Sequence, residues 1–440
     1  MLKRRGRIVQ LVNDGKTLLK RLMGHHAGFY LAAAYLFFEY FRPQVIYTWI
    51  DVLPWARIII LSGFFYVIAK GHVKLQGMHW LLFTFMCLVF VSTYFSFDRI
   101  ASLNTIDYII SWVVIVVFFT AAVRNLEQYK VLLILLFIFL FKMSFFGART
   151  WATRGFGFAD WGISGPKGFF QNSGELSLLM VVFTAMSLGF ILGHKNVNKI
   201  YYLVPITAAM TVLASSTRGS QLALAVVAVL FLLCYGKLRI KYILAFSVIA
   251  WIGFALLPEE QKDRFRDMGQ DDTSESRLTY WEKGWEMMNN HKLVGVGYYA
   301  FPSYFEHHYA PYIQFENFTY RREVAHNSFI QVGSEMGYPG LIVYLLLLWQ
   351  CYKLNKKSQK YANANPNNAS ISWVPSYCTG QNIALAGYVV GSLFMSVAFY
   401  PYLYLFLMLA ASLHQVITPH NKAPEIGAAY IKGPTNVPQN

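Results

Sequence analysis

Residues 129–147 read YKVLLILLFIFLFKMSFFG, an almost unbroken run of apolar side chains. A helix of about 20 such residues crosses the hydrocarbon core of a bilayer. Comparable runs recur along the chain, and together with this one they make twelve. We therefore predict an all-α, polytopic membrane protein with about twelve transmembrane helices. The other runs lie near residues 24–41, 53–69, 78–96, 106–123, 174–193, 200–216, 219–235, 240–257, 337–352, 382–400 and 401–418.

The composition agrees with this prediction, because 56% of the 440 residues are hydrophobic and only 14% are charged. Soluble domains carry about 25% charged residues. The same figures exclude a fibrous, disordered or disulfide-stapled chain. The net charge of +16 is spread thinly, so we predict no nucleic-acid partner. The four cysteines lie in or beside apolar runs and lack the pair spacing of a zinc site.

The apolar runs divide the chain unevenly, with nine before one long polar stretch and three after it. We predict a nine-span bundle, a large loop that carries the catalytic residues, three C-terminal spans and a flexible tail, at residues 1–257, 258–336, 337–418 and 419–440. The Lys- and Asn-rich residues 353–380 are also expected to be flexible. This asymmetry argues against a pseudo-symmetric transporter.

The distribution of Lys and Arg predicts the orientation. Positive charge concentrates in short cytoplasmic segments of membrane proteins. It is dense in the N-terminal segment and recurs in alternate turns, as at Lys237, Arg239 and Lys241. We therefore expect both termini in the cytoplasm and the large loop, between the ninth and tenth spans, on the outer side.

Arg218 lies in a tight connection between two predicted spans, Ser215-Ser-Thr-Arg218-Gly-Ser220. One interpretation is a snorkelling arginine that pairs with lipid phosphate. The other is a guanidinium group presented to a substrate phosphate, with small neighbours that permit close approach. We favour the second, because charges that line a membrane pathway are usually functional.

Arg277 lies in the first half of the large loop, near the start of a predicted helix. Asp272 and Glu275 have the spacing of a capping box, and Leu278, Trp281, Trp285 and Met288 follow at helical spacing. This pattern predicts an amphipathic helix on the membrane surface. We expect Arg277 either to contact the same substrate phosphates as Arg218 or to form a salt bridge with Glu275 or another loop carboxylate.

His326 opens a helical-looking stretch that continues into the tenth span, and a basic pair, Arg321 and Arg322, precedes it. A lone histidine is more often structural than catalytic. Its position at the outer membrane face nevertheless makes it the candidate base, because imidazole accepts protons near neutral pH. Asn327 and Arg322 are candidate substrate-binding residues beside it.

A further candidate is the segment Gly165-Pro-Lys167-Gly-Phe-Phe-Gln-Asn172-Ser-Gly-Glu175, at the outer entry to the sixth span. Its glycines permit irregular backbone, and its polar side chains lie where they would face a cavity rather than lipid. Lys167 and Asn172 are therefore candidate substrate-binding residues. An ordinary loop with a helix cap explains the segment equally well.

The sequence contains no Walker loop, no GxGxxG after a strand, no HExxH and no GxSxG. Asp271 and Asp272 form only a weak acidic pair. We therefore expect chemistry that uses arginine and histidine side chains, with no cofactor and no metal.

Together these motifs resemble those of the O-antigen ligase/polymerase superfamily of bacterial integral-membrane glycosyltransferases. The resemblance covers about residues 165–350, and the earlier spans agree only in number and hydropathy. The motifs are Ser216-Thr-Arg218-Gly219, Arg277 in the loop, Leu293-Val-Gly295-Val-Gly297, and Ala325-His326-Asn327-Ser328 running into Glu335-Met-Gly337-Tyr-Pro339-Gly340.

The resemblance implies transfer of a glycan from an undecaprenyl-diphosphate carrier to an acceptor hydroxyl, at the periplasmic face of the inner membrane. In a ligase the acceptor is lipid A–core. Arg218 and Arg277 would correspond to the arginines that hold the diphosphate, and His326 to the essential histidine beside the acceptor. Whether His326 acts as a base or positions the acceptor stays open.

Two other functions are compatible with these features. An O-antigen or exopolysaccharide polymerase joins repeat units, and such enzymes often have two sizeable outer loops, whereas this chain has one large loop and a shorter one at about residues 148–173. A polysaccharide carrier would also accommodate twelve spans. Lys142, inside the fifth span, suits a carrier, a donor entry crevice, or a pair with Glu39 or Glu175.

Overall fold

The computed structural model describes residues 2–157, 162–236, 262, 272–313 and 322–418. Within these ranges the regular secondary structure is entirely helical. The elements are α1 (Leu2–Arg21), α2 (Ala27–Leu36), η1 (Phe37–Phe41), α3 (Pro43–Ile46), η2 (Thr48–Ile50), α4 (Trp55–Ala69), α5 (Gly77–Tyr94), α6 (Arg99–Ala122), α7 (Leu126–Thr153), α8 (Ser173–Leu192), η3 (Lys199–Tyr202), α9 (Leu203–Ala214), α10 (Arg218–Tyr235), α13 (Asp272–Asn290), α14 (Phe301–His308), η4 (Ala310–Tyr312), α15 (Ser328–Ala364), η5 (Ala369–Ile371), α16 (Val374–Ser392) and α17 (Pro401–Ile417).

Six helices in the described part of the chain are long and apolar enough to cross a membrane, namely α5, α6, α7, α8, α10 and α15. Shorter apolar helices of 10–17 residues cover the predicted spans at 24–41, 53–69, 200–216 and 401–418. The predicted span at 240–257 lies outside the described residues. An all-helical membrane fold is therefore confirmed, whereas the total of twelve spans stays a prediction.

Two predicted segments differ in the structure. Residues 353–380 were expected to be flexible, but α15 continues to Ala364 and α16 begins at Val374. The predicted span at 382–400 is wrong in its bounds, because α16 ends at Ser392 and a loop covers residues 393–400. The predicted tail at 419–440 lies outside the described residues.

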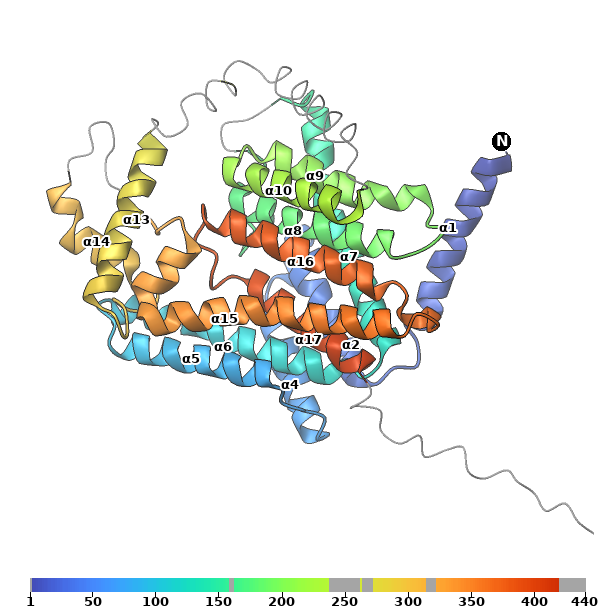
Figure 1. The fold of residues 1–440 in the computed structure, drawn as a ribbon, viewed down its shortest axis with the longest axis horizontal. Helices are drawn as coiled ribbons and strands as arrows, with labels where there is room; N and C mark the ends of the chain where they lie inside the picture. Colours follow the sequence, from blue (N-terminus) through green and yellow to red (C-terminus); the bar gives the residue numbers. More distant parts are fainter. Residues whose placement is uncertain (1, 158–161, 237–261, 263–271, 314–321, 419–440) are drawn as a thin grey trace, which may run out of the picture.

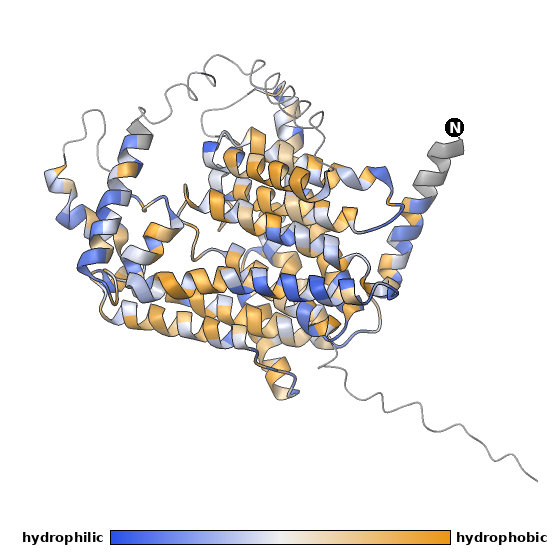
Figure 2. Cartoon of the chain, viewed as in Figure 1, coloured by the Kyte–Doolittle hydropathy of each residue, from blue (hydrophilic) through white to orange (hydrophobic). Residues whose placement is uncertain are grey.

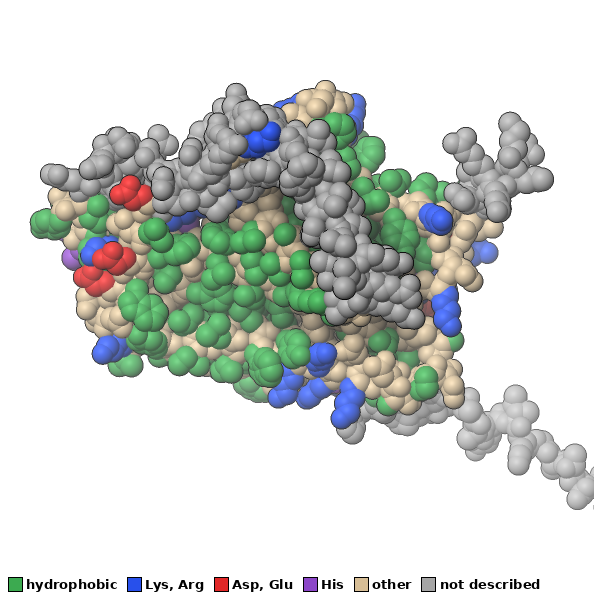
Figure 3. Space-filling model, turned by 45° about the horizontal axis from the view of Figure 1, so that its top comes forward, with side chains coloured by type: hydrophobic (Ala, Val, Ile, Leu, Met, Phe, Trp, Pro, Cys, Tyr) green, Lys and Arg blue, Asp and Glu red, His purple; other side chains and the backbone are tan. Residues whose placement is uncertain are grey.

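The longer helices run side by side along the long axis of the molecule, with hydrophobic residues over their middle parts (Figures 1 and 2). A broad hydrophobic face covers the middle of the surface in Figure 3. Apolar side chains such as Ile58, Phe65 and Leu222 are exposed on the surface of the helices. A bilayer accounts for such exposure, because lipid tails solvate apolar side chains as well as a protein core does.

The last helix, α17, lies in the interior and is buried almost all round, from Pro401 to Leu413. Neighbouring helices are also joined by hydroxyl groups, including the 2.6 Å hydrogen bond from Ser177 of α8 to Ser220 of α10. In an apolar environment such hydrogen bonds and close packing hold helices together.

The loops gather at the two ends of the bundle. At one end, with α13 and α14, the Phe97 N–H donates to the Val296 carbonyl at 2.9 Å and Arg322 pairs with Asp98 at 3.0 Å. These contacts join the α5–α6 connection to the large predicted outer loop. We call this the loop end.

At the opposite end, Arg21 pairs with Glu127 at 3.7 Å, and Lys130 lies 2.9 Å from His194. These residues belong to, or directly flank, segments that the charge pattern assigns to the cytoplasm. We call this the basic end. The structure thus separates the two predicted groups of segments, while their assignment to the two sides of a membrane stays a prediction.

Candidate functional site

Arg218 is the first residue of α10 and is half-buried. The preceding turn is strained, because Ser216 has φ 55°. The following residue, Gly219, packs against Phe394, and an added Cβ would lie 2.7 Å from the Phe394 Cβ atom. Only glycine therefore allows the start of α10 to approach the 393–400 loop this closely.

Arg277 lies on α13, one turn before Tyr280 and Trp281. The Trp281 indole N–H donates to the Ala325 carbonyl at 3.0 Å, and the ring centroids of Tyr280 and His326 are 6.5 Å apart. Residues three and four apart share one face of a helix. Arg277 is therefore on the face of α13 that turns toward His326.

The neighbouring Tyr280 is fully buried, and burial raises its pKa to about 12. It therefore stays a neutral phenol at physiological pH. With Met287 it forms part of a small apolar cluster that fixes α13 against α14 and the segment before α15.

His326 precedes α15 in a left-handed conformation, with φ 49°. A non-glycine residue in this region is strained by about 1 kcal/mol, and such strain is found most often at functional sites. Its Nε2 atom lies 3.0 Å from Glu323 Oε2. The Asn327 side-chain oxygen accepts hydrogen bonds from the N–H groups of Phe329 and Ile330, so this oxygen serves as the cap of α15.

The loop at 393–400 connects these separate elements. Its Met395 carbonyl accepts a hydrogen bond from Ser328 Oγ at 2.7 Å, and its Val397 N–H donates to the same hydroxyl oxygen at 2.9 Å. The ring centroids of Phe394 and Trp281 are 6.3 Å apart. The loop thus touches α10, α13 and α15 beside Arg218, Arg277 and His326 respectively. This role was missed in the sequence, because residues 382–400 resembled a continuous span.

The start of α8 reaches the same loop, since a Cβ on Gly174 would lie 3.3 Å from Met395 Sδ. Asn172 precedes α8 without capping it, and its Nδ2 donates instead to Glu175 Oε1 at 3.2 Å. Glu175 lies in the first turn of α8. Its Oε2 atom is buried and has no hydrogen-bond partner among the described residues. Glu175 therefore lies beside the loop at 393–400, whereas the sequence had placed it facing a cavity and as a possible partner of Lys142.

Two predicted site residues have other neighbours. Lys167 is exposed and precedes Gly168, whose Cβ position would lie 2.5 Å from the Arg42 guanidinium. Arg322 forms an ion pair with Asp98 and a hydrogen bond with Ser303. The Ser303 hydroxyl, more than the Arg322 charge, lowers the pKa of Asp98. Arg322 is therefore engaged in holding the large loop to the start of α6.

The two glycine motifs interlock. The N–H groups of Val296 and Gly297 donate to the carbonyls of Ser334 and Glu335, at 2.8 and 3.1 Å. Gly295 has φ +68°, and an added Cβ would lie 2.2 Å from the Glu335 carbonyl carbon. These contacts attach the end of α13 to the first turns of α15, which follow His326.

A kink in α15 completes this attachment. Gly337 has φ 68° inside the helix, and its Cβ position would lie 2.5 Å from the Lys292 carbonyl oxygen. The same carbonyl accepts a hydrogen bond from the Tyr338 N–H at 2.9 Å. The kink therefore provides the close approach between α15 and the segment after α13.

Lys142 donates from Nζ to the Phe41 carbonyl at 3.0 Å. Glu39, a predicted partner, instead pairs with Arg42 at 3.5 Å. Lys142 thus satisfies a backbone carbonyl at the end of η1. Elsewhere in the described ranges, no three His, Cys, Asp or Glu side chains gather as metal ligands would.

These features define a class: a helical membrane protein with a polar site, rich in arginine, histidine and carboxylates, where its loops converge. Residues 203–345, from α9 to the first half of α15, match the family model Wzy_C, described as O-Antigen ligase. The match confirms the predicted resemblance to the O-antigen ligase/polymerase superfamily and supports a membrane glycosyltransferase-like enzyme. It includes Arg218, Arg277 and His326, whereas Lys167 and Asn172 lie before it. Comparison with curated proteins gave no match.

Proposed function

We propose that this protein is an O-antigen ligase-type glycosyltransferase. It transfers a glycan from an undecaprenyl-diphosphate carrier to a hydroxyl of lipid A–core, at the periplasmic face of the bacterial inner membrane. The family match supports this general activity. The donor, the acceptor and the side of the membrane are part of the proposal.

One observation carries the proposal. Arg218, Arg277 and His326 are separated by long stretches of sequence, yet the elements beside all three contact the loop at 393–400. Two guanidinium groups and one imidazole at a membrane-protein surface suit a substrate with a diphosphate and a hydroxyl nucleophile.

In the proposed reaction, the acceptor oxygen forms a bond to the anomeric carbon of the donor sugar. The bond from that carbon to the diphosphate oxygen breaks, and the diphosphate leaves with the electron pair. Arg218 and Arg277 stabilise the negative charge that grows on it. Preorganised groups of this kind contribute about 100- to 1,000-fold to the rate.

His326 accepts the proton of the acceptor hydroxyl. Glu323 is a positioning residue, because its carboxylate lies 3.0 Å from Nε2 and can accept a hydrogen bond from the N–H at that nitrogen. The other ring nitrogen, Nδ1, is then the acceptor for the substrate proton. Glu175, with its buried and unpartnered oxygen, supports a second polar contact to the acceptor sugar.

A polymerase that joins repeat units is the second candidate. The loop between α7 and α8 bears on this choice, because α7 extends to Thr153 and α8 begins at Ser173. The second outer loop is therefore shorter than its predicted span of 148–173. A single dominant loop favours the ligase.

The test is a gel of surface polysaccharide from a deletion strain that carries the wild-type gene or a His326→Ala gene. We expect long glycan on the undecaprenyl carrier and bare core in the variant, with a loss of ligation of about 100-fold or more. The matched control is His307→Ala, because His307 is exposed on α14. It should give the normal ladder.

Arg277→Ala should give the same loss while the protein still inserts, and Arg99→Ala, an exposed arginine at the same end, should not. Core that bears a single repeat would identify a polymerase instead. A normal ladder from the His326→Ala gene would refute the catalytic assignment and favour a carrier.

A further inference from the structure

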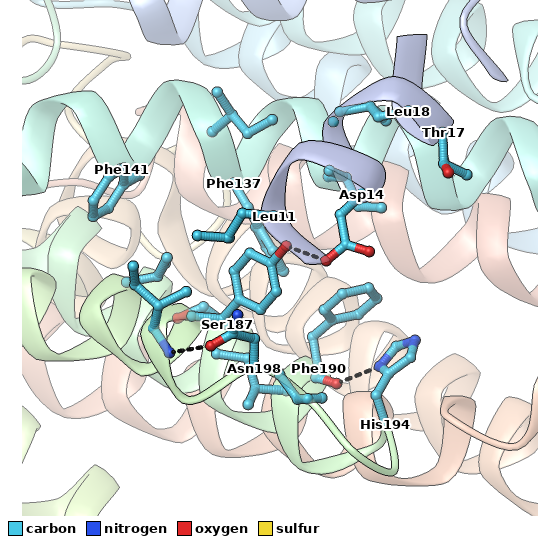
Figure 4. A pocket seen from close by; sticks show the side chains of 18 of the residues that line it. Leu11, Asp14, Thr17, Leu18, Phe137, Phe141, Ser187, Phe190, His194 and Asn198 are labelled. Atoms are coloured by element: carbon cyan, nitrogen blue, oxygen red, sulfur yellow. Dashed lines mark hydrogen bonds between the residues drawn. The ribbon is translucent and has the colours of Figure 1, made fainter. Parts of the chain in front are cut away.

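A second site lies at the basic end of the molecule, between α1 and the bundle. It is a cavity of about 780 Å³, a size typical of small-molecule sites. Figure 4 shows Leu11, Asp14 and Leu18 of α1 on one side of it, with Phe137 and Phe141 of α7 among the other walls. Nothing in the proposed transfer reaction uses this cavity.

The cavity exists because α1 stands away from the bundle. Two polar contacts join it to the bundle: Asp14 accepts a hydrogen bond from the Tyr201 hydroxyl at 2.6 Å, and Arg21 pairs with Glu127. Leu11 and Leu18, seven residues apart on one helix face, line the cavity. An apolar face held at a distance from its neighbours indicates a further apolar occupant.

The walls along α7 are apolar over a considerable length. Ile134, Phe137, Ile138 and Phe141 line the cavity and follow Lys130 on the same helix. From residue 130 to residue 141 an α-helix rises about 16 Å. An alkyl chain lying along α7 fits such a wall, whereas a compact polar metabolite does not.

The cavity is lined by a lysine that has no anionic partner in the described part of the chain. Lys130 is half-buried, and its Nζ atom lies 2.9 Å from His194 Nε2 and over the rings of Phe190 and Trp373. No carboxylate among the described residues lies within ion-pair distance of it. Lys195 also lines the cavity.

His194 does not balance the positive charge of Lys130. Its Nδ1 atom lies 2.9 Å from the Phe190 carbonyl, so the N–H is on that side and Nε2 accepts from Lys130. Burial lowers the pKa of His194, which keeps the ring neutral. A partly buried ammonium group without an anion is unfavourable, and a phosphate would compensate it.

We propose that this cavity binds an anionic phospholipid. Its phosphate lies at Lys130 and Lys195, and one acyl chain lies along α7 beneath Leu11 and Leu18 of α1. The apolar wall that follows Lys130 along α7 as far as Phe141 suits a lipid rather than a soluble phosphate. The site is independent of the proposed transfer reaction, and its test reads lipid binding alone.

The experiment uses the full-length protein in nanodiscs of phosphatidylethanolamine with a minor fraction of phosphatidylglycerol. Native mass spectrometry after release from the disc counts the lipids that remain bound. We expect retained phosphatidylglycerol in the wild type, and an apparent affinity about fivefold weaker in Lys130→Ala, from the loss of one cation near a lipid phosphate. Lys353→Ala, an exposed lysine of α15 outside the cavity, is the matched control and should bind as the wild type does.

A second variant tests the apolar wall without changing charge. Ile134→Trp places a bulky side chain in the cavity and should abolish retention, whereas Ile110→Trp on the exposed surface of α6 should not. If Lys130→Ala fails to fold, Lys130→Arg should still retain the lipid and Ile134→Trp decides the outcome. Wild-type retention in Lys130→Ala or in Ile134→Trp would overturn the proposal. So would displacement of the lipid by millimolar inorganic phosphate, which would indicate a soluble-anion site.

Discussion

Replacement of Gly295 by alanine tests the interlock between the end of α13 and the kinked helix α15. Gly295 has φ +68°, and its Cβ position lies 2.2 Å from the carbonyl carbon of Glu335. A methyl group cannot occupy that position, so the two backbone segments must separate. The hydrogen bonds that Val296 and Gly297 donate to α15 are then lost.

The expected magnitude has two parts. Alanine in a left-handed conformation costs about 1 kcal/mol relative to glycine. Two backbone hydrogen bonds contribute about 1 kcal/mol each, which brings the total loss in the free energy of unfolding to about 3 kcal/mol. Because His326 precedes the displaced turns of α15, glycan transfer should fall as well.

Gly71 provides a matched control. Its φ is +63°, and no atom lies within 4 Å of its Cβ position. Gly71→Ala should therefore lose only about 1 kcal/mol and retain transfer activity. Both variants would be unfolded in detergent micelles with increasing dodecyl sulfate and followed by circular dichroism. Equal losses of stability in the two variants would refute the close contact at Glu335.

Two further outcomes follow from side-chain contacts at the loop end. Asp98→Asn should lower stability by about 1 kcal/mol at pH 7, because the Ser303 hydroxyl lowers the pKa of the Asp98 carboxyl. That stabilisation is complete above about pH 4, the ordinary range of aspartate, and is lost as the pH falls through the lowered value. Melting temperatures of the two proteins should therefore converge in acid, and a gap independent of pH would contradict the assignment. Trp281→Phe should reduce transfer by removing the hydrogen bond to Ala325, whereas Trp285→Phe, at an exposed position of α13, should match the wild type in the same assay.

The apolar runs predicted most helices, because an uninterrupted apolar segment has few alternatives in a membrane. The boundaries were less predictable where a helix buries small or polar residues. In the lysine-rich end of α15, Leu354, Asn355, Ser358 and Ala362 are buried on one face. Averaged hydropathy hides this face, so the segment was interpreted as flexible.

The sequence selected candidate site residues one by one but not their arrangement. Charge and position selected Arg218, Arg277 and His326, and the family match includes all three. Their common neighbour at residues 393–400 was missed, because its role depends on Ser328, far away in the sequence. Glu175 was named only as facing a cavity and as a possible partner of Lys142, because the contact between the start of α8 and the 393–400 loop arises only in the folded chain.

The position of the 393–400 loop near the end of the chain has a consequence for synthesis. The arginines and the histidine emerge from the ribosome well before residues 393–400 and the central helix α17 that follows. Until then, the loop that contacts the starts of α10, α13 and α15 is missing. A nascent or truncated chain therefore contains Arg218, Arg277 and His326 without the loop that joins the elements beside them.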